Sequence, residues 1–215
     1  MTPGPPPPKL PRPGRRRAGP DGPARIAGLR PPDAPPGYPD QYERQVRLRD
    51  GRTVFIRPIV PGDAPALAQA IRSADQETLY RRFLGAPPRV TPALLAHLTT
   101  VDYARRFAVV AGDATGRGIG IARYEPDSEG TAEVAVAIDP AWRRVGLATE
   151  LITTLAQAAL DHGVHTFTAT YLAQNRPVAA LLGHTGAAGR TIISQGIAEA
   201  LVALDETPAG HEPHP

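Results

Sequence analysis

The sequence has no cysteine and only one lysine among its 215 residues. Without cysteine the chain cannot form a disulfide, a thiolate metal site or a cysteine nucleophile. Because Lys9 is the only lysine, modification of the chain's own lysine side chains can occur at no other position. The six histidines form no helical or short-loop pair suited to a metal ion, so no metal site is expected.

Long apolar runs are missing as well, and aromatic residues make up only 5% of the chain. No segment approaches the roughly 18 uninterrupted apolar residues that a membrane span requires. The N-terminus is charged and proline-rich and is not followed by an apolar stretch, which argues against a secretory signal. We therefore expect a cytoplasmic protein that does not associate with a membrane.

Proline and charge divide the chain into two parts. Residues 1–40 hold 14 of the 26 prolines and carry a formal charge of +4, whereas the remainder carries −1. Such a segment buries too little apolar surface to offset its ordering entropy. The composition therefore predicts a disordered Pro/Arg-rich leader at 1–42, one domain at 43–205 and a disordered tail at 206–215. The basic leader could contact nucleic acid, but a solvated leader is the favoured interpretation. No pattern indicates an oligomeric state.

The domain alternates between strand and helix signals. Asp50-Gly51 is a hairpin turn between two short strands, and Asp63, Asp75 and Thr91-Pro92 are typical helix starts. The remaining elements are expected as strands at 107–111, 118–124 and 131–138, a helix at 149–162, a strand at 166–172, a helix at 177–182 and a final strand at 191–204. The order is β-α-α-α-β-β-β-α-β-α-β, with the first hairpin as one β, which predicts an α/β domain with a mixed central β-sheet flanked by helices.

One glycine-rich stretch has the spacing of a known motif but is not interpreted as a binding site. The stretch Gly116-Arg-Gly118-Ile-Gly120 has the spacing of a dinucleotide-binding motif. However, a strand rather than a helix is expected to follow it, so the required context is missing. The stretch is interpreted as a hairpin loop.

A basic, glycine-containing turn joins the strand at 131–138 to the helix that follows it. The segment reads Trp-Arg-Arg-Val-Gly-Leu-Ala-Thr over residues 142–149. A helix N-terminus presents free N–H groups and the positive end of the macrodipole, so it favours an anion. Gly146 and Ala148 leave room for a phosphate, Arg143 and Arg144 add charge, and Thr149 offers a hydroxyl. The segment therefore predicts an anion-binding turn.

A single carboxylate interrupts the apolar strand just before this turn. Glu133 lies in Ala-Glu-Val-Ala-Val-Ala-Ile, ten residues before Arg143. A partly buried carboxylate can act as a general base on an ammonium group. The alternative is that Glu133 lies at an exposed strand end and pairs with one of the 23 arginines.

The pattern Arg-x-x-Gly-x-Ala at 143–148 resembles the pyrophosphate-binding signature of the GNAT family of N-acetyltransferases, Gln/Arg-x-x-Gly-x-Gly/Ala. The resemblance, which extends in element order over roughly 44–204, implies a GNAT-like fold and acetyl-CoA as cosubstrate. It implies that the pantetheine arm pairs with the backbone of the strand at Val136, Ala137 and Ile138. The residues implied at the cofactor site are Val136, Ala137, Ile138, Arg143, Arg144, Val145, Gly146, Leu147, Ala148, Thr149 and Asn175.

Other segments resemble the bacterial protein-lysine acetyltransferase, or Pat-like, branch of the family. They are the strand around Glu133 and the segments 76–83 and 98–103. In this branch the equivalent glutamate is the general base. The chain departs from the wider family at Leu182, where many members have a tyrosine that protonates the leaving thiolate. Tyr171 and His184 are the remaining candidate acids.

These features predict an N-acetyltransferase that moves an acetyl group from acetyl-CoA to a primary amine by direct attack, with Glu133 as base. A protein lysine is the first expected acceptor and a small amine the second. A non-catalytic acyl-CoA-binding regulatory module is the alternative, because the usual tyrosine is missing.

Overall fold

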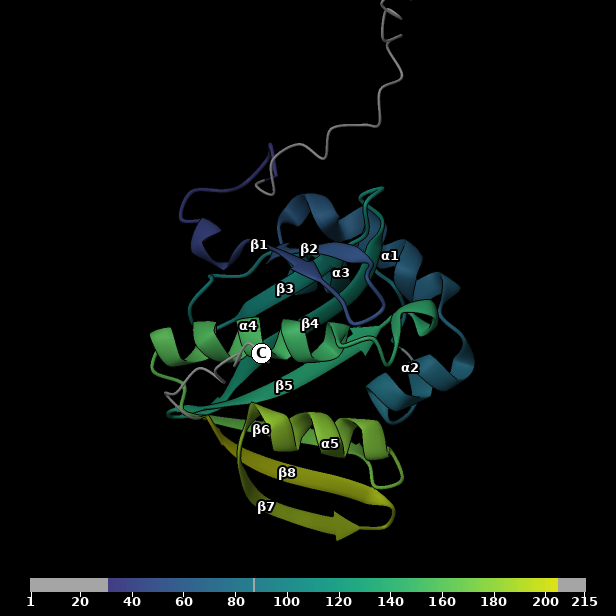
Figure 1. Cartoon of the computed structure of the whole chain (residues 1–215), viewed down its shortest axis with the longest axis vertical. Coiled ribbons are helices and arrows are strands. Elements are labelled where there is room, and N and C mark those ends of the chain that lie inside the picture. Colours follow the sequence, from purple (N-terminus) through teal and green to yellow (C-terminus); the bar gives the residue numbers. More distant parts are fainter. Residues whose placement is uncertain (1–30, 87, 205–215) are drawn as a thin grey trace, which may run out of the picture.

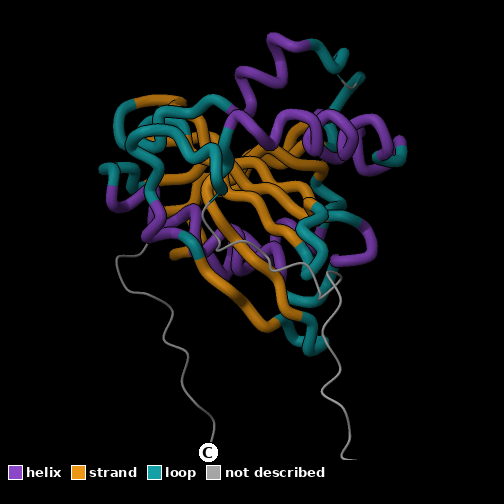
Figure 2. The backbone as a smooth tube through the Cα atoms, turned by 90° about the horizontal axis from the view of Figure 1, so that it is seen from above, coloured by secondary structure: helices purple, strands orange, loops and turns teal. Residues whose placement is uncertain are grey.

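The computed structural model describes residues 31–86 and 88–204. Most of the predicted leader, residues 1–30, and the predicted tail at 206–215 lie outside the described residues. The described chain has helices on both faces of one central β-sheet (Figures 1 and 2).

The sheet has eight described strands in the order β1-β2-β3-β4-β5-β6-β8-β7. Every neighbouring pair is antiparallel except β5 with β6. This is a mixed sheet, as the sequence predicted. The strands are β1 (Arg44–Arg47), β2 (Thr53–Pro58), β3 (Phe107–Gly112), β4 (Gly118–Ser128), β5 (Thr131–Ile138), β6 (Thr166–Leu172), β7 (Gly186–Ser194) and β8 (Ile197–Leu204).

The described helices form the outer layers. In Figure 1, α4 (Leu147–Asp161) and α5 (Arg176–Thr185) lie in front of the sheet. Three further helices, α1 (Ala64–Ser73), α2 (Gln76–Phe83) and α3 (Pro92–Thr99), pack on the other side. Short 3₁₀ turns complete the connections: η1 (Asp40–Tyr42), η2 (Pro61–Asp63) and η3 (Pro140–Trp142).

The core lies between α4 and the centre of the sheet. Leu147, Leu151 and Leu155 of α4 follow the helical repeat and are at most 1% exposed. They belong to one apolar cluster with Phe107 and Tyr124, whose rings stack with centroids 6.0 Å apart. This packing holds the N-terminus of α4 against the end of the sheet where β5 finishes.

Most expected elements are confirmed. The strands at 131–138 and 166–172 have the predicted bounds, and the helix predicted at 149–162 runs from Leu147 to Asp161. Its end is confirmed by Gly163, whose φ is +77° and so favours glycine. The Asp50-Gly51 hairpin and the loop before β4 are also confirmed.

Two expectations about the chain ends require correction. The single final strand expected at 191–204 is instead part of the hairpin β7–β8. Its turn is formed by Gln195 and Gly196, both with positive φ, which suits a two-residue hairpin turn. At the other end, Tyr38 and Tyr42 fall within the predicted leader but are buried, at 6% and 3% exposed. Their rings add apolar surface that the high proline content had masked, so packing begins before residue 43.

Gly120 of β4 permits the close approach of α4. A Cβ at this position would lie 3.0 Å from the side chains of both Ile138 and Leu151 and 3.4 Å from that of Leu147. The Gly120→Val variant is therefore expected to lose about 1–3 kcal/mol of unfolding free energy through overpacking. Urea denaturation measures this loss.

Gly118→Val is the matched control, because Gly118 lies in the same strand and a Cβ there would have nothing within 4 Å. This control is expected to be neutral or slightly stabilising, since valine favours strands. Equal losses in the two variants would contradict the close-packing role of Gly120.

Candidate active site

The predicted anion-binding turn lies where the chain leaves β5 and enters α4. Gly146 precedes the helix with φ +95°, and Arg144 has φ +64°. Positive φ is uncommon for a residue other than glycine and marks backbone strain of the kind that gathers at functional sites. No side chain caps the start of α4. The first N–H groups of a helix have no acceptor within the helix, so those at Leu147, Ala148 and Thr149 can receive an anion.

The β1–β2 hairpin brings two further arginines to this turn, which the sequence analysis missed. The N–H of Arg49 donates to the carbonyl oxygen of Val145 (3.1 Å), and the Arg49 side chain lies beside Gly146. Arg52 stacks on Trp142, with its guanidinium carbon 3.7 Å from the ring centroid, and donates to the carbonyl of Ala141 (3.2 Å). The only sequence signal was the clustering of arginines around the Asp-Gly turn. The turn is therefore more basic than residues 142–149 alone imply.

Arg143 uses its side chain within the protein. Its Nε donates to the carbonyl oxygen of Ile138 (3.3 Å), and its Nη2 donates to Oγ1 of Thr78 in α2 (2.8 Å). By contrast, the side chain of Arg144 is exposed. Of the two arginines predicted at the turn, Arg144 is thus the one that projects into solvent.

The sheet forks between β5 and β6. The parallel pairing covers Thr131, Ala132 and Glu133 of β5 and ends there, although β5 continues to Ile138 (Figure 1). On its other side β5 remains fully paired with β4. The backbone of Val136, Ala137 and Ile138 therefore has one edge without a strand partner, facing the fork. An extended chain with amide groups can pair with such an edge.

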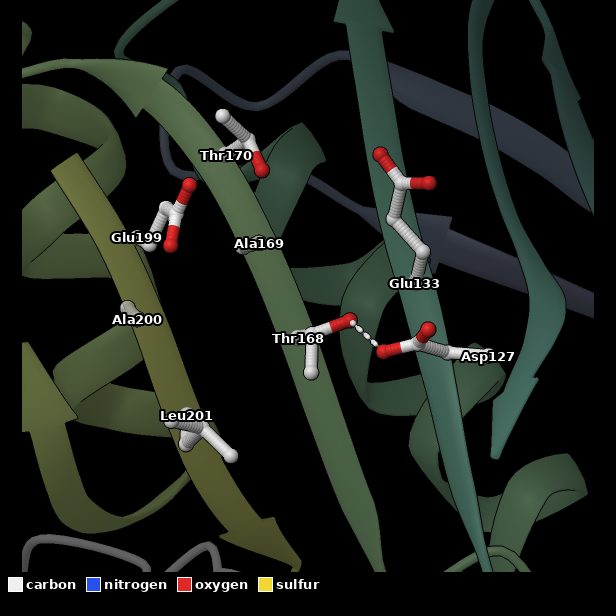
Figure 3. Close-up of a pocket in the computed structure, with 8 residues that line it drawn as sticks. All are labelled: Asp127, Glu133, Thr168, Ala169, Thr170, Glu199, Ala200 and Leu201. Atoms are coloured by element: carbon white, nitrogen blue, oxygen red, sulfur yellow. Dashed lines mark hydrogen bonds between the residues drawn. The ribbon is translucent and has the colours of Figure 1, made fainter. Parts of the chain in front are cut away.

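Glu133 is the last β5 residue in the parallel pairing and therefore stands at the fork. Its side chain is exposed and lines a pocket of about 290 Å³ together with Asp127, Thr168, Thr170 and Glu199. Figure 3 shows the carboxylates of Glu133 and Glu199 on opposite sides of β6, while Asp127 accepts a hydrogen bond from Thr168 (3.3 Å). Three carboxylates and no basic side chain line the pocket, which favours a cationic ligand.

The neighbouring carboxylate on β4 differs from Glu133 in its partners. Glu125 pairs across the strands with Glu133 but forms an ion pair with the buried Arg123, and His97 lies 3.3 Å from it. No ion pair to Glu133 is found among the residues that the structure describes. The structure thus confirms one part of the alternative for Glu133, its exposed side chain, and corrects the expected partial burial. The arginine pairing in that alternative has no support in the described chain.

The other predicted residues lie around the fork or away from it. Asn175 directly precedes α5, and its carbonyl oxygen accepts from the N–H of Val178 (3.0 Å). Leu182, at the position of the family's usual tyrosine, is buried in the core. Tyr171 is also buried, and strand alternation puts it on the opposite face of β6 from Thr168 and Thr170. The side chain of His184 is outside the described residues.

The described residues include neither a clustered metal site nor a membrane-spanning helix. Between residues 31 and 204, apart from Pro87, no group of three or more histidine, aspartate or glutamate side chains is arranged to hold a metal ion. None of the described helices has both the length and the apolar character needed to cross a bilayer.

Known proteins share both the sequence pattern and the fold. A family model described as "Acetyltransferase (GNAT) domain" matches residues 53–188. Acetyltransferase Pat of Mycolicibacterium smegmatis is 33% identical over 145 residues, which are 66% of this chain and 43% of that protein. The chain thus spans less than half the length of that relative.

Solved structures agree with the family match. The GNAT domain of S. lividans PAT superposes with a TM-score of 0.71 and 27% identity, covering 78% of this chain and 99% of that one. A putative acetyltransferase from Salmonella typhimurium, solved with its cofactor acetyl-CoA, shares the fold (TM-score 0.54, 19% identity, 73% and 96% coverage). The chain therefore belongs to the GNAT family of acetyltransferases and is homologous to its Pat-type members.

Proposed function

We propose that this chain transfers an acetyl group from acetyl-CoA to the side-chain amine of a protein lysine, with Glu133 as the general base. One observation carries the proposal: the same strand, β5, has an unpaired edge that runs from the anion-binding turn to Glu133. At about 3.3 Å per residue, the five steps from Ile138 to Glu133 span about 17 Å. A donor anchored at the turn can therefore extend along this edge and deliver its far end to the carboxylate.

The donor is bound by main-chain groups in this proposal. The N–H groups at the start of α4 and the turn of residues 143–149 receive the pyrophosphate, with Arg49 and Arg144 adding charge. The edge at Val136, Ala137 and Ile138 pairs with the amides of the pantetheine arm, and Asn175 borders the fork from the β6 side. The cofactor of the Salmonella structure, acetyl-CoA, supports this assignment through the shared fold.

The reaction needs a neutral amine next to the thioester. A lysine ammonium has a pKa near 10.4 in water, so the Glu133 carboxylate takes one of its protons, directly or through a water. The amine nitrogen then forms a bond with the thioester carbonyl carbon, and the carbon–sulfur bond breaks. The thiolate of CoA leaves and takes up, directly or through water, the second proton that the nitrogen loses as the amide forms. This is feasible because a thiol has a pKa near 8.5. The chain has no cysteine to carry an acyl-enzyme, and the proposed attack of the amine on the thioester is direct.

The acidic pocket supports a cationic acceptor. Asp127, Glu133 and Glu199 line it without a basic neighbour, which raises the local concentration of ammonium groups. The pocket lies on the face of the paired strands β6 and β8 beside Glu133, where the long side chain of a lysine on another protein can reach it. A small amine is the second acceptor class. The catalytic unit in this proposal is the domain of residues 43–205, with Tyr38 and Tyr42 packed against it.

The test is an acetylation assay with the full chain carrying Lys9→Arg, which removes the chain's only lysine and hence any self-acetylation background on lysine. A lysine-containing peptide is incubated with acetyl-CoA, and mass spectrometry measures a gain of one acetyl group together with release of CoA. The same peptide with arginine in place of lysine is the control and is expected to remain unchanged.

Other outcomes separate the alternatives. Acetylation of small amines but of no peptide would contradict the protein acceptor and favour the second class. Binding of acetyl-CoA without transfer to any amine would contradict the enzyme and favour the regulatory module.

A further inference from the structure

Arg143 connects three parts of the candidate site. Its backbone belongs to the anion-binding turn, its Nε donates to Ile138 at the end of β5, and its Nη2 donates to Thr78 in α2. The two side-chain distances are 3.3 Å and 2.8 Å. Sixty-five residues separate Arg143 from Thr78, so this contact joins elements that the sequence does not place together.

Thr78 is itself held in a fixed orientation. Asp75 caps α2, and its carboxylate accepts from both the N–H and the hydroxyl of Thr78, each at 2.7 Å. With its proton donated to Asp75, the hydroxyl presents a lone pair to Arg143. The two bonds from Thr78, and to a smaller extent the charge of Arg143, hold the pKa of Asp75 below its ordinary value. The Thr78 hydroxyl thus links two oppositely charged groups, the Asp75 carboxylate and the Arg143 guanidinium.

The helix that receives this contact borders the fork. α2 packs against both β5 and β6, the two strands that diverge at Glu133. Figure 1 shows α2 beside the segment that leads from β5 to α4. Any shift of α2 therefore changes the wall of the space in which the acceptor meets the thioester.

We propose that Thr78 is a positioning residue. Its hydrogen bond with Arg143 fixes α2 against the cofactor turn. One guanidinium group then both orders the turn and places the helix that borders the acceptor side of the fork. The proposal rests on the proposed function. It also gives the Arg143 side chain a role beyond a direct phosphate contact, because two of its five N–H donors bind protein acceptors.

The experiment compares Thr78→Val with Thr78→Ser in the acetylation assay. Valine has the shape of threonine but accepts no hydrogen bond, whereas serine keeps the hydroxyl. For Thr78→Val we expect the KM for the peptide to rise about tenfold, in keeping with the loss of one hydrogen bond to a charged group. The Kd for acetyl-CoA, measured by calorimetry, is expected to change by less than about twofold, and Thr78→Ser is expected to restore the peptide KM.

A second comparison tests whether the residues act together. In an Arg143→Gln background, Thr78→Val is expected to add little further change in the peptide KM, because the shared contact is already lost. Tighter binding of acetyl-CoA by Thr78→Val would overturn the proposal, since it would mean that Thr78 withholds Arg143 from the phosphates. An unchanged peptide KM, or a lower melting temperature with unchanged kinetics, would overturn it too.

Amide hydrogen exchange separates a failure of this inference from a failure of the proposed function. If the wild type binds acetyl-CoA but acetylates nothing, the proposed function fails. The inference is then judged by the amides of α2: cofactor binding at the turn should protect them in the wild type and in Thr78→Ser, but not in Thr78→Val. Equal protection in all three proteins would overturn it.

Discussion

The Glu133→Gln variant is expected to turn over about 10²- to 10⁴-fold more slowly than the wild type, the usual contribution of a general base. Glutamine keeps the size and the hydrogen-bonding oxygen of the side chain but cannot accept the ammonium proton at neutral pH. Because Glu133 lies at the fork and not at the turn, the Kd for acetyl-CoA is expected to stay near the wild-type value. Steady-state kinetics with the lysine peptide and calorimetry with acetyl-CoA measure the two quantities.

Glu129→Gln provides the matched control for charge. Glu129 is exposed in the tight connection between β4 and β5, four residues before Glu133, and does not line the pocket that contains Glu133. This variant loses the same formal charge but is expected to retain full turnover. If Glu133→Gln is as active as this control, Glu133 is an ordinary exposed residue and another group must remove the proton.

The Gly146→Glu variant is expected to weaken acetyl-CoA binding by about two orders of magnitude. Two effects act in the same direction. Glycine is required by the φ of +95°, so a side chain strains the turn that presents the N–H groups. In addition, a carboxylate about 7 Å from one pyrophosphate charge costs about 2.4 kcal/mol at an effective dielectric constant of about 20, which is more than a fiftyfold loss in affinity. Calorimetric titration with acetyl-CoA measures the change.

Gly163→Glu separates the strain from the charge at the turn. Gly163 also has positive φ (+77°), is exposed and has nothing within 4 Å of a Cβ. It therefore suffers a comparable backbone strain at the C-terminal end of α4, about 22 Å along the helix from the anion-binding turn. Its acetyl-CoA affinity is expected to match the wild type, even if both variants melt at a lower temperature. Equal loss of affinity in both would mean that general destabilisation, and not the turn, is responsible.

Local patterns were sufficient to predict the centre of the fold. The β5–turn–α4 segment could be predicted because apolar alternation, a glycine-containing basic turn and a helical repeat follow one another directly between Thr131 and Asp161. The start of α4 was placed two residues late, since Gly146 and not a polar side chain precedes the helix. The β7–β8 turn was missed because Gln-Gly is a weaker turn signal than Asn-Gly or Asp-Gly.

Long-range contacts at the site could not be read from the sequence. Arg49 reaches the turn because the β1–β2 hairpin lies next to it, almost one hundred residues away along the chain. Thr78 meets Arg143 only through the packing of α2. The fork itself depends on where parallel pairing stops, and nothing in the residue types of β5 or β6 marks that point. Sequence reasoning therefore predicted the segments that form the site but not the contacts that bring these segments together.

The short β5–β6 pairing also has a mechanical consequence. Three residues of parallel ladder join the sheet β1–β5 to the unit formed by β6, β8 and β7, while α4 bridges the two by contacting β3, β4 and α5. This is the shortest ladder among the described strand pairs, so we expect the unit of β6, β8 and β7 to separate from the rest of the sheet here more readily than at the other strand pairs. A ligand that pairs with the free edge of β5 would replace the missing part of the ladder. One bound molecule would therefore couple the two parts of the sheet and reduce their relative motion.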